Sequence, residues 1–140
     1  MLITSVLICK VQYEDYNENN YIREEILSTR PDIRVYYNFL KGGEAEHIIN
    51  KYGNRLKSSS LVGENGAREY NDFRTSTSAF LLQSEDSIIR DIEARIEKYA
   101  NTTLPKIEPL QLLNYKKGQQ FKPHTDWFGR DYIKSEKGQR

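Results

Sequence analysis

The pattern of apolar and polar residues along the chain predicts four β-strands. In the first of them, Val35, Tyr37 and Phe39 fall on one side of an extended backbone, because successive side chains of a strand point to opposite faces. A turn at Lys116 and Lys117 separates the last two strands. The predicted strands cover residues 33–40, 79–82, 109–115 and 120–128.

Two other segments carry apolar residues at the spacing of one helical face. The first opens after Gly43, and the second runs over residues 86–99, with Ser84 as its predicted N-cap. Residues 57–71, rich in Ser, Gly, Asn and Glu, are predicted to form a loop. The buried stripes are expected to be Ala45, Ile48, Ile49, Tyr52 and Leu56 in the first helix and Ile88, Ile89, Ile92, Ile96 and Tyr99 in the second. Because the strands are concentrated late in the chain, this order of elements predicts an α+β fold.

Composition narrows the class of protein without naming a function. The 140 residues are 37% hydrophobic and 29% charged, and 21 basic residues nearly balance 20 acidic ones. That balance offers no electrostatic case for nucleic acid or an acidic membrane as a partner. With Cys9 as its single cysteine, the chain can form no internal disulfide. The apolar start, residues 2–9, is too short to span a membrane and is expected to be a strand or a frayed terminus, with a truncated signal as the alternative.

The residues best suited to chemistry are His124 and Asp126, which are two positions apart in the last predicted strand. Side chains at i and i+2 of a strand share a face, so the imidazole and the carboxylate can reach one metal ion. They would supply part of the two-histidine, one-carboxylate set that binds non-haem iron(II). Taken alone, this pair is a weak signal, because a histidine hydrogen-bonded to a nearby aspartate is a common structural motif.

The residues around this pair resemble the metal-binding strand of prolyl 4-hydroxylases, where Tyr-x-x-Gly-Gln-x-Tyr-x-Pro-His-x-Asp is typical. This chain has Tyr115-x-x-Gly118-Gln119-x-Phe121-x-Pro123-His124-x-Asp126. Upstream, an Arg-Thr-Ser element at 74–76, Phe-Leu at 80–81 and the helical pattern at 89–96 are also similar to the family, as are the opening strands near residues 25–27 and 35–40. The resemblance covers residues 24–140, with residues 1–23 as a lead-in. It implies an incomplete double-stranded β-helix, of the jelly-roll or cupin type, with two N-terminal supporting helices.

The resemblance also implies roles for individual residues. His124 and Asp126 would bind iron(II), and Tyr115 would contact the cosubstrate 2-oxoglutarate; ascorbate is the further cofactor that the family implies. The residues that match positions in the peptide-substrate groove are Arg74, Ser76, Glu108 and Arg140. Phe121 departs from the family, which usually has tyrosine there, and this puts the choice of substrate in doubt.

Structural alternatives remain open for several of these residues. Tyr115 could be a core aromatic whose hydroxyl is satisfied. Arg74 and Glu108 could form surface ion pairs. Trp127 alternates out of phase with the metal pair and is expected to pack on the opposite face. His47, the second of two histidines, is interpreted as a surface residue of the first helix.

The family also requires a second histidine ligand and a lysine for 2-oxoglutarate, both well after the His-x-Asp pair, and residues 127–140 contain no histidine. The chain is therefore expected to need a missing C-terminal part, to bind iron weakly and to turn over no substrate by itself. The implied function is 4-hydroxylation of peptidyl proline in proline-rich or collagen-like proteins. Alternatives are a non-catalytic module that binds proline-rich peptides and, more remotely, an unrelated α+β domain. By its family, the protein could be located in the endoplasmic reticulum, and the cytoplasm is the alternative location.

Overall fold

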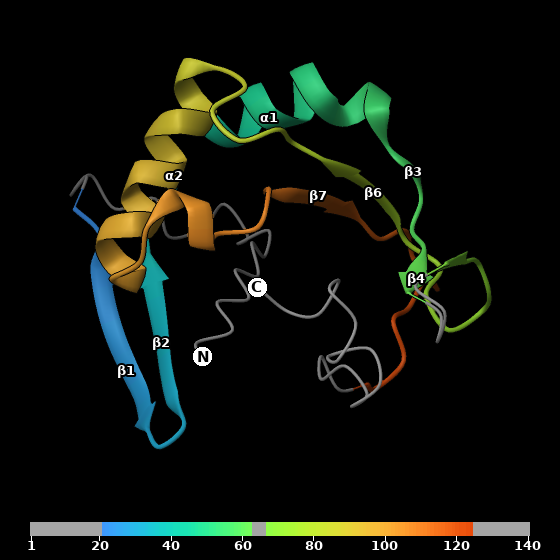
Figure 1. Cartoon of the computed structure of the whole chain (residues 1–140), viewed down its shortest axis with the longest axis horizontal. Helices are drawn as coiled ribbons and strands as arrows, with labels where there is room; N and C mark the ends of the chain where they lie inside the picture. The colour runs from blue at the N-terminus through green and yellow to red at the C-terminus, as the bar shows by residue number, and fades with distance from the viewer. Residues whose placement is uncertain (1–20, 63–66, 125–140) are drawn as a thin grey trace. The chain divides into compact units, whose positions relative to one another are not determined.

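The computed structural model describes residues 21–62 and 67–124 (Figure 1). The chain forms two compact units, residues 1–47 and residues 48–140, and the boundary between them falls inside the first helix. Within the described ranges, no helix is both long enough and apolar enough to cross a membrane.

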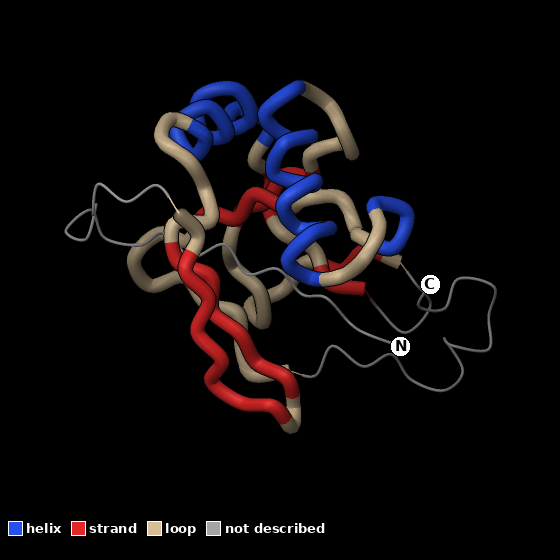
Figure 2. The backbone as a smooth tube through the Cα atoms, turned by 90° about the vertical axis from the view of Figure 1, so that its left-hand side faces the viewer, coloured by secondary structure: helices blue, strands red, loops and turns tan. Residues whose placement is uncertain are grey.

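The first unit contains an antiparallel hairpin of β1 (Arg23–Thr29) and β2 (Asp32–Tyr37). Its two strands run side by side as the long red pair in Figure 2. The register shifts between Ile26 and Ser28, so β1 carries a bulge. The two opening strands are confirmed, but β2 ends earlier than the predicted strand at 33–40. The reason is Asn38, whose φ of 55° is left-handed and breaks the extended backbone.

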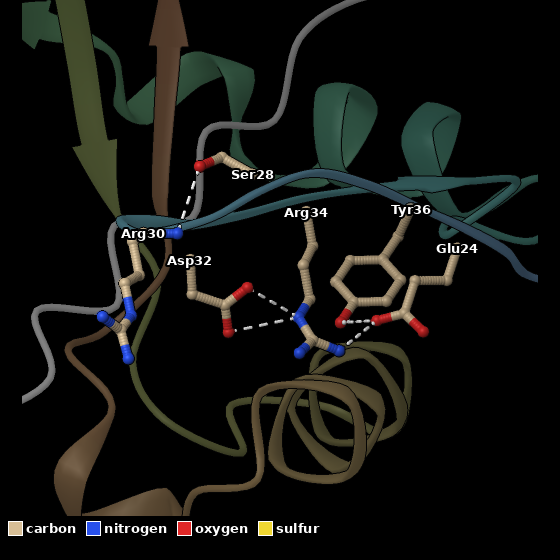
Figure 3. A network of polar contacts seen from close by, with 6 residues as sticks. All are labelled: Glu24, Ser28, Arg30, Asp32, Arg34 and Tyr36. Carbon is tan, nitrogen blue, oxygen red and sulfur yellow. Dashed lines mark hydrogen bonds and ion pairs between the residues drawn. The ribbon is translucent and has the colours of Figure 1, made fainter.

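One face of the hairpin carries a polar network (Figure 3). The Arg34 guanidinium donates to Glu24 Oε1 at 2.7 Å and to Asp32 Oδ1 at 2.9 Å, and the Tyr36 hydroxyl donates to the same Glu24 oxygen at 2.9 Å. These hydrogen bonds, Arg34 first and Tyr36 second, lower the pKa of Glu24 below its ordinary value. The network ties the two strands together across exposed surface, where each ion pair contributes little stability.

Helix α1 (Glu44–Tyr52) confirms the first predicted helix. Gly43, with φ of 82°, turns the chain into it, and the Glu44 carboxylate accepts a hydrogen bond from the Lys41 amide at 2.8 Å. Ile48 and Tyr52 are buried, whereas Ile49 is 59% exposed. The expectation that Ile49 belongs to the buried stripe is therefore wrong. Each residue turns the helix by about 100°, so Ile49 lies beyond the edge of the face that Ile48 and Tyr52 share.

Helix α2 (Ser87–Ala100) confirms the second predicted helix but corrects its N-cap. The Asp86 carboxylate accepts from the Ile89 amide at 2.8 Å, which makes Asp86 the cap residue. Ser84 instead has a left-handed φ of 55° and donates its amide and hydroxyl to the buried carboxylate of Glu93. The helix ends at Asn101, which is also left-handed.

The second unit contains a three-stranded antiparallel sheet in the order β3 (Lys57–Ser58), β6 (Thr77–Phe80), β7 (Gln111–Asn114). Figure 1 shows β6 and β7 side by side, paired from Thr77↔Asn114 to Phe80↔Gln111. A further pair joins β4 (Leu61–Val62) and β5 (Arg68–Glu69). The segment predicted as a loop, 57–71, thus holds three short strands. Strand β3 pairs with β6, outside this segment, whereas β4 and β5 pair with each other within it. Local composition encodes neither pairing.

The core of the second unit joins the helices to the sheet. A 3₁₀ helix, η2 (Gly53–Arg55), follows α1, and another, η3 (Leu104–Lys106), precedes β7. The buried apolar side chains are Ile48, Tyr52, Ala79, Leu81, Ile89, Ile92, Ile96, Ile107 and Leu110. Removing these side chains from water is the main favourable term in folding the unit.

The α+β class and the two helices are confirmed. Among the described residues the strands form small antiparallel sheets and no closed barrel, so the jelly-roll detail is not part of what the structure shows. The strand expected at 120–128 appears within its described part only as an isolated bridge at Phe121. Asp126, Trp127 and Arg140 lie outside the described residues.

Candidate functional site

Two sequence segments that are far apart in the chain are paired in space. The Lys122 amide donates to the Phe73 carbonyl at 2.9 Å, and the Thr75 amide donates to the Gln120 carbonyl, also at 2.9 Å. The Thr75 hydroxyl accepts from the Gln120 amide at 2.8 Å. These bonds bring the Arg-Thr-Ser element next to the Gly-Gln-x-Phe element, the two motifs that the sequence singled out.

The turn before this pairing is held by Gln119. Its side-chain amide donates to the Thr75 carbonyl at 2.6 Å, and its oxygen accepts from the Lys116 amide at 2.7 Å. Gly118 has φ of 85°, a conformation that glycine adopts without strain. Lys116 and Lys117 are exposed, which confirms the predicted solvated turn. Sequence reasoning gave Gln119 no role, although its place in the motif was a signal that could have found it.

His124 lies against an aromatic cluster on the same pairing. Its ring stacks on Phe121, with 3.7 Å between the ring centroids and 23° between the planes. Phe73 meets both rings edge-on, at 6.0 Å from Phe121 and 6.4 Å from His124. His124 Nδ1 is 2.8 Å from the Lys122 carbonyl oxygen and donates its proton to it.

Arg74 is opposite Phe121 in the backbone bridge. Its guanidinium carbon is 4.7 Å from the Phe121 ring centroid, a cation–π geometry, and Nη1 donates to the Ser60 carbonyl at 3.5 Å. The Arg74 Nε is buried and has no hydrogen-bond partner among the described residues. Arg74 is therefore not a simple surface ion-pairing residue, because its guanidinium packs against the Phe121 ring.

The remaining predicted site residues differ in exposure. Ser76 is 1% exposed, and its hydroxyl donates to Ser59 Oγ at 2.9 Å, so it links the residue before β6 to the residue after β3. Tyr115 follows β7 and is 43% exposed, which contradicts the alternative of a core aromatic. Glu108 is exposed. Their roles toward substrate and cosubstrate stay predictions.

Comparisons with known proteins identify the family. The chain is 37% identical over 117 residues to "Probable prolyl 4-hydroxylase 3" of Arabidopsis thaliana, which covers 83% of this chain and 41% of that protein. It is 34% identical over 117 residues to "Prolyl 4-hydroxylase 5", with 83% and 40% covered, and 33% identical over 128 residues to "Probable prolyl 4-hydroxylase 8", with 91% and 43% covered, both of the same plant. No model of a protein family matches the chain.

The chain belongs to the prolyl 4-hydroxylase family. These relatives are named prolyl 4-hydroxylases. In this chain, Arg74 of one motif and His124 of the other both lie against the ring of Phe121. The chain spans about two-fifths of the length of the curated relatives it matches, which are covered to 41% and 40%.

The described part of this prolyl 4-hydroxylase-like site fits a metal ligand at His124. A proton on Nδ1, donated to a backbone carbonyl, leaves the lone pair on Nε2, and this is the tautomer that a histidine bound to a metal through Nε2 requires. Within residues 21–62 and 67–124, no three His, Cys, Asp or Glu side chains are grouped closely enough to hold a metal ion. His47, the other histidine, is half-buried in α1 and belongs to the first unit. The predicted partner ligand Asp126 lies outside the described residues.

Proposed function

We propose that the chain provides part of the active site of a prolyl 4-hydroxylase that uses iron(II), 2-oxoglutarate, dioxygen and ascorbate to hydroxylate peptidyl proline at C4. The observation that carries this proposal is the Nδ1 hydrogen bond of His124 to the Lys122 carbonyl, made within the pairing of the two family motifs. It prepares Nε2 for a metal, and it uses a residue that the family resemblance assigns to iron. The proposed substrates are proline-rich or collagen-like peptides.

Each residue has a distinct task in this proposal. His124 and Asp126 would hold the iron, and the hydroxyl of Tyr115 would orient 2-oxoglutarate by a hydrogen bond. The bound iron and 2-oxoglutarate supply the activation of dioxygen. The family resemblance assigns substrate contacts to Arg74, Ser76, Glu108 and Arg140, although the hydroxyl of Ser76 is buried against Ser59 and does not face solvent.

Arg74 is the substrate residue with the best-defined surroundings. Because the Phe121 ring holds its guanidinium, Arg74 would present donors to the carbonyl groups of an extended peptide without losing much side-chain freedom on binding. A proline-rich peptide has the same advantage, since its polyproline-II conformation is largely set before binding.

The second candidate is a non-catalytic module that binds proline-rich peptides. One observation supports it: the Arg74 guanidinium is held over the Phe121 ring, at 4.7 Å from its centroid, by a contact that requires no metal ion.

Metal titration separates His124 from the other histidine. The purified chain is titrated with cobalt(II), and His124→Ala is compared with the matched variant His47→Ala. The proposal requires that His124→Ala abolishes the spectroscopic signal of bound cobalt and that His47→Ala preserves it. The reverse result, or equal loss in both variants, would refute the assignment of His124.

A turnover assay tests whether the chain by itself is catalytically active. The 140-residue chain is incubated with iron(II), 2-oxoglutarate, ascorbate and a proline-rich peptide, and succinate is measured. We expect no succinate above background, with peptide binding still detected by fluorescence anisotropy and weakened in Arg74→Ala. Succinate release that depends on His124 would instead mean that another group completes the iron site, and the non-catalytic candidate would be rejected.

A further inference from the structure

Two groups lie against the Phe121 ring. The His124 imidazole stacks on the ring at 3.7 Å between centroids, and the guanidinium carbon of Arg74 lies over the same ring at 4.7 Å from its centroid. Phe121 is therefore in contact with a cation and with an imidazole, while Phe73 closes the cluster edge-on.

The backbone determines where this ring lies. Phe121 forms a bridge with Arg74, and hydrogen bonds of 2.9 Å flank the bridge on both sides, from Lys122 to Phe73 and from Thr75 to Gln120. Phe121 thus belongs to one of two segments that are paired through their backbones. The position of its ring does not depend on the exposed His124.

His124, in contrast, has an exposed side chain whose orientation must come from its neighbours. Two of its contacts constrain the ring in complementary ways. Stacking on Phe121 sets the plane of the imidazole, and the Nδ1 hydrogen bond to the Lys122 carbonyl sets its rotation within that plane. A ring in another plane could not keep Nδ1 aligned with that carbonyl, because hydrogen bonds weaken steeply away from linearity.

We propose that Phe121 is a positioning residue that holds His124 in the Nδ1-protonated tautomer, with Nε2 kept as the ligating nitrogen. The metal-binding part of this proposal rests on the proposed function, and the tautomer part does not. Phe121 orients the His124 imidazole through the face of its aromatic ring. It follows that a phenylalanine can do this as well as a tyrosine, and that the missing hydroxyl at this position leaves the positioning intact.

The tautomer is measured in the metal-free chain by nitrogen-15 NMR, at a pH where the spectra show both histidines to be neutral. In the wild type, His124 is expected to be protonated mainly on Nδ1. Phe121→Leu removes the ring face and should shift the population toward Nε2 protonation, whereas Phe121→Tyr should match the wild type. Phe80→Leu is the matched control, because Phe80 is 55% exposed on β6, and His47 is an internal reference in every sample.

Metal affinity is the second readout. In the cobalt(II) titration, Phe121→Leu should weaken binding about tenfold, the lower end of what outer partners of a metal ligand contribute, and Phe121→Tyr should stay within about twofold. If Phe121→Leu folds and neither the tautomer nor the affinity changes, Phe121 is not a positioning residue. If His124→Ala binds cobalt as the wild type does, the proposed function fails, while the tautomer result still decides the role of Phe121.

A measurement on the wild type keeps the inference testable even if Phe121→Leu does not fold. Ring protons of Phe121 and His124 that stack at 3.7 Å between centroids must give strong nuclear Overhauser contacts. Their absence in the folded wild-type chain would overturn the proposal.

Discussion

Replacing Asp86 with alanine removes three interactions of one carboxylate. Asp86 Oδ1 accepts from the Ile89 amide at 2.8 Å, and Oδ2 accepts from the Tyr52 hydroxyl and from Lys51 Nζ, each at 2.7 Å. Tyr52 is fully buried, so its hydroxyl has lost contact with bulk water in the folded chain. The carboxylate thus caps α2 and also connects that helix to the end of α1.

The first two interactions set the size of the effect. Loss of an N-cap costs about 1 kcal/mol, and loss of a hydrogen bond from a buried hydroxyl to a charged acceptor costs about 1.5–3 kcal/mol. The ion pair with the exposed Lys51 adds little, because solvent screens it. We therefore expect Asp86→Ala to lower the free energy of unfolding by about 3 kcal/mol. Asp86→Asn keeps one acceptor oxygen, which is enough for the cap on the Ile89 amide, and its NH2 group can donate to the Tyr52 oxygen in place of the lost acceptor, so it should cost about 1 kcal/mol.

The assay is urea unfolding followed by circular dichroism, with Ser84→Ala as the comparison. Ser84 was the N-cap expected from the sequence, whereas in the structure its hydroxyl donates to Glu93 Oε2 at 3.2 Å. Loss of that one bond should cost about 1 kcal/mol. If Ser84→Ala were as destabilising as Asp86→Ala, or if Asp86→Asn were no milder than Asp86→Ala, the capping role of Asp86 would be refuted.

Three further predictions address the turn, the helix face and the hairpin. Gly118→Ala should destabilise the chain by about 1 kcal/mol in urea unfolding, because an added Cβ meets open space and the only penalty is the left-handed backbone. Ile48→Ala should cost about 2–4 kcal/mol, whereas its exposed neighbour Ile49→Ala should change stability by no more than about 0.5 kcal/mol. In the hairpin, Arg34→Gln should raise the pKa of Glu24 toward its ordinary value in a carbon-13 NMR titration of the carboxyl group. Because the folded-state pKa of Glu24 is lowered, its stabilising contribution is present above the unfolded pKa of about 4.3 and is lost as pH falls through the folded value.

Each of these predictions can fail. A neutral or stabilising Gly118→Ala would mean that the turn does not need a left-handed residue. Equal losses for Ile48→Ala and Ile49→Ala would place both side chains in the core. A Glu24 pKa that does not respond to Arg34→Gln would exclude the hydrogen bond from Arg34 as the main cause of the shift.

The sequence by itself determined the features that depend on local periodicity and on a contiguous motif. The apolar stripes predicted both helices, and Ile89, Ile92 and Ile96 are buried as expected. Short apolar runs predicted β6 and β7 to within a few residues. The pattern from Tyr115 to Asp126 was enough to indicate the family, because the spacing of residues in a motif needs no tertiary information.

The tertiary structure decided which groups become partners. Asp86 caps α2 in place of Ser84, because the amide and hydroxyl of Ser84 donate to the buried carboxylate of Glu93, nine residues further along the chain. Within residues 57–71, β3 forms by pairing with the distant β6, whereas β4 and β5 pair with each other. Likewise, no sequence pattern sets Arg74 against Phe121 or stacks His124 on that ring. The physical reason is common to all of these cases: a hydrogen bond or ring contact between distant residues forms only after the backbone has brought them together, so it is a property of the fold and not of any local segment.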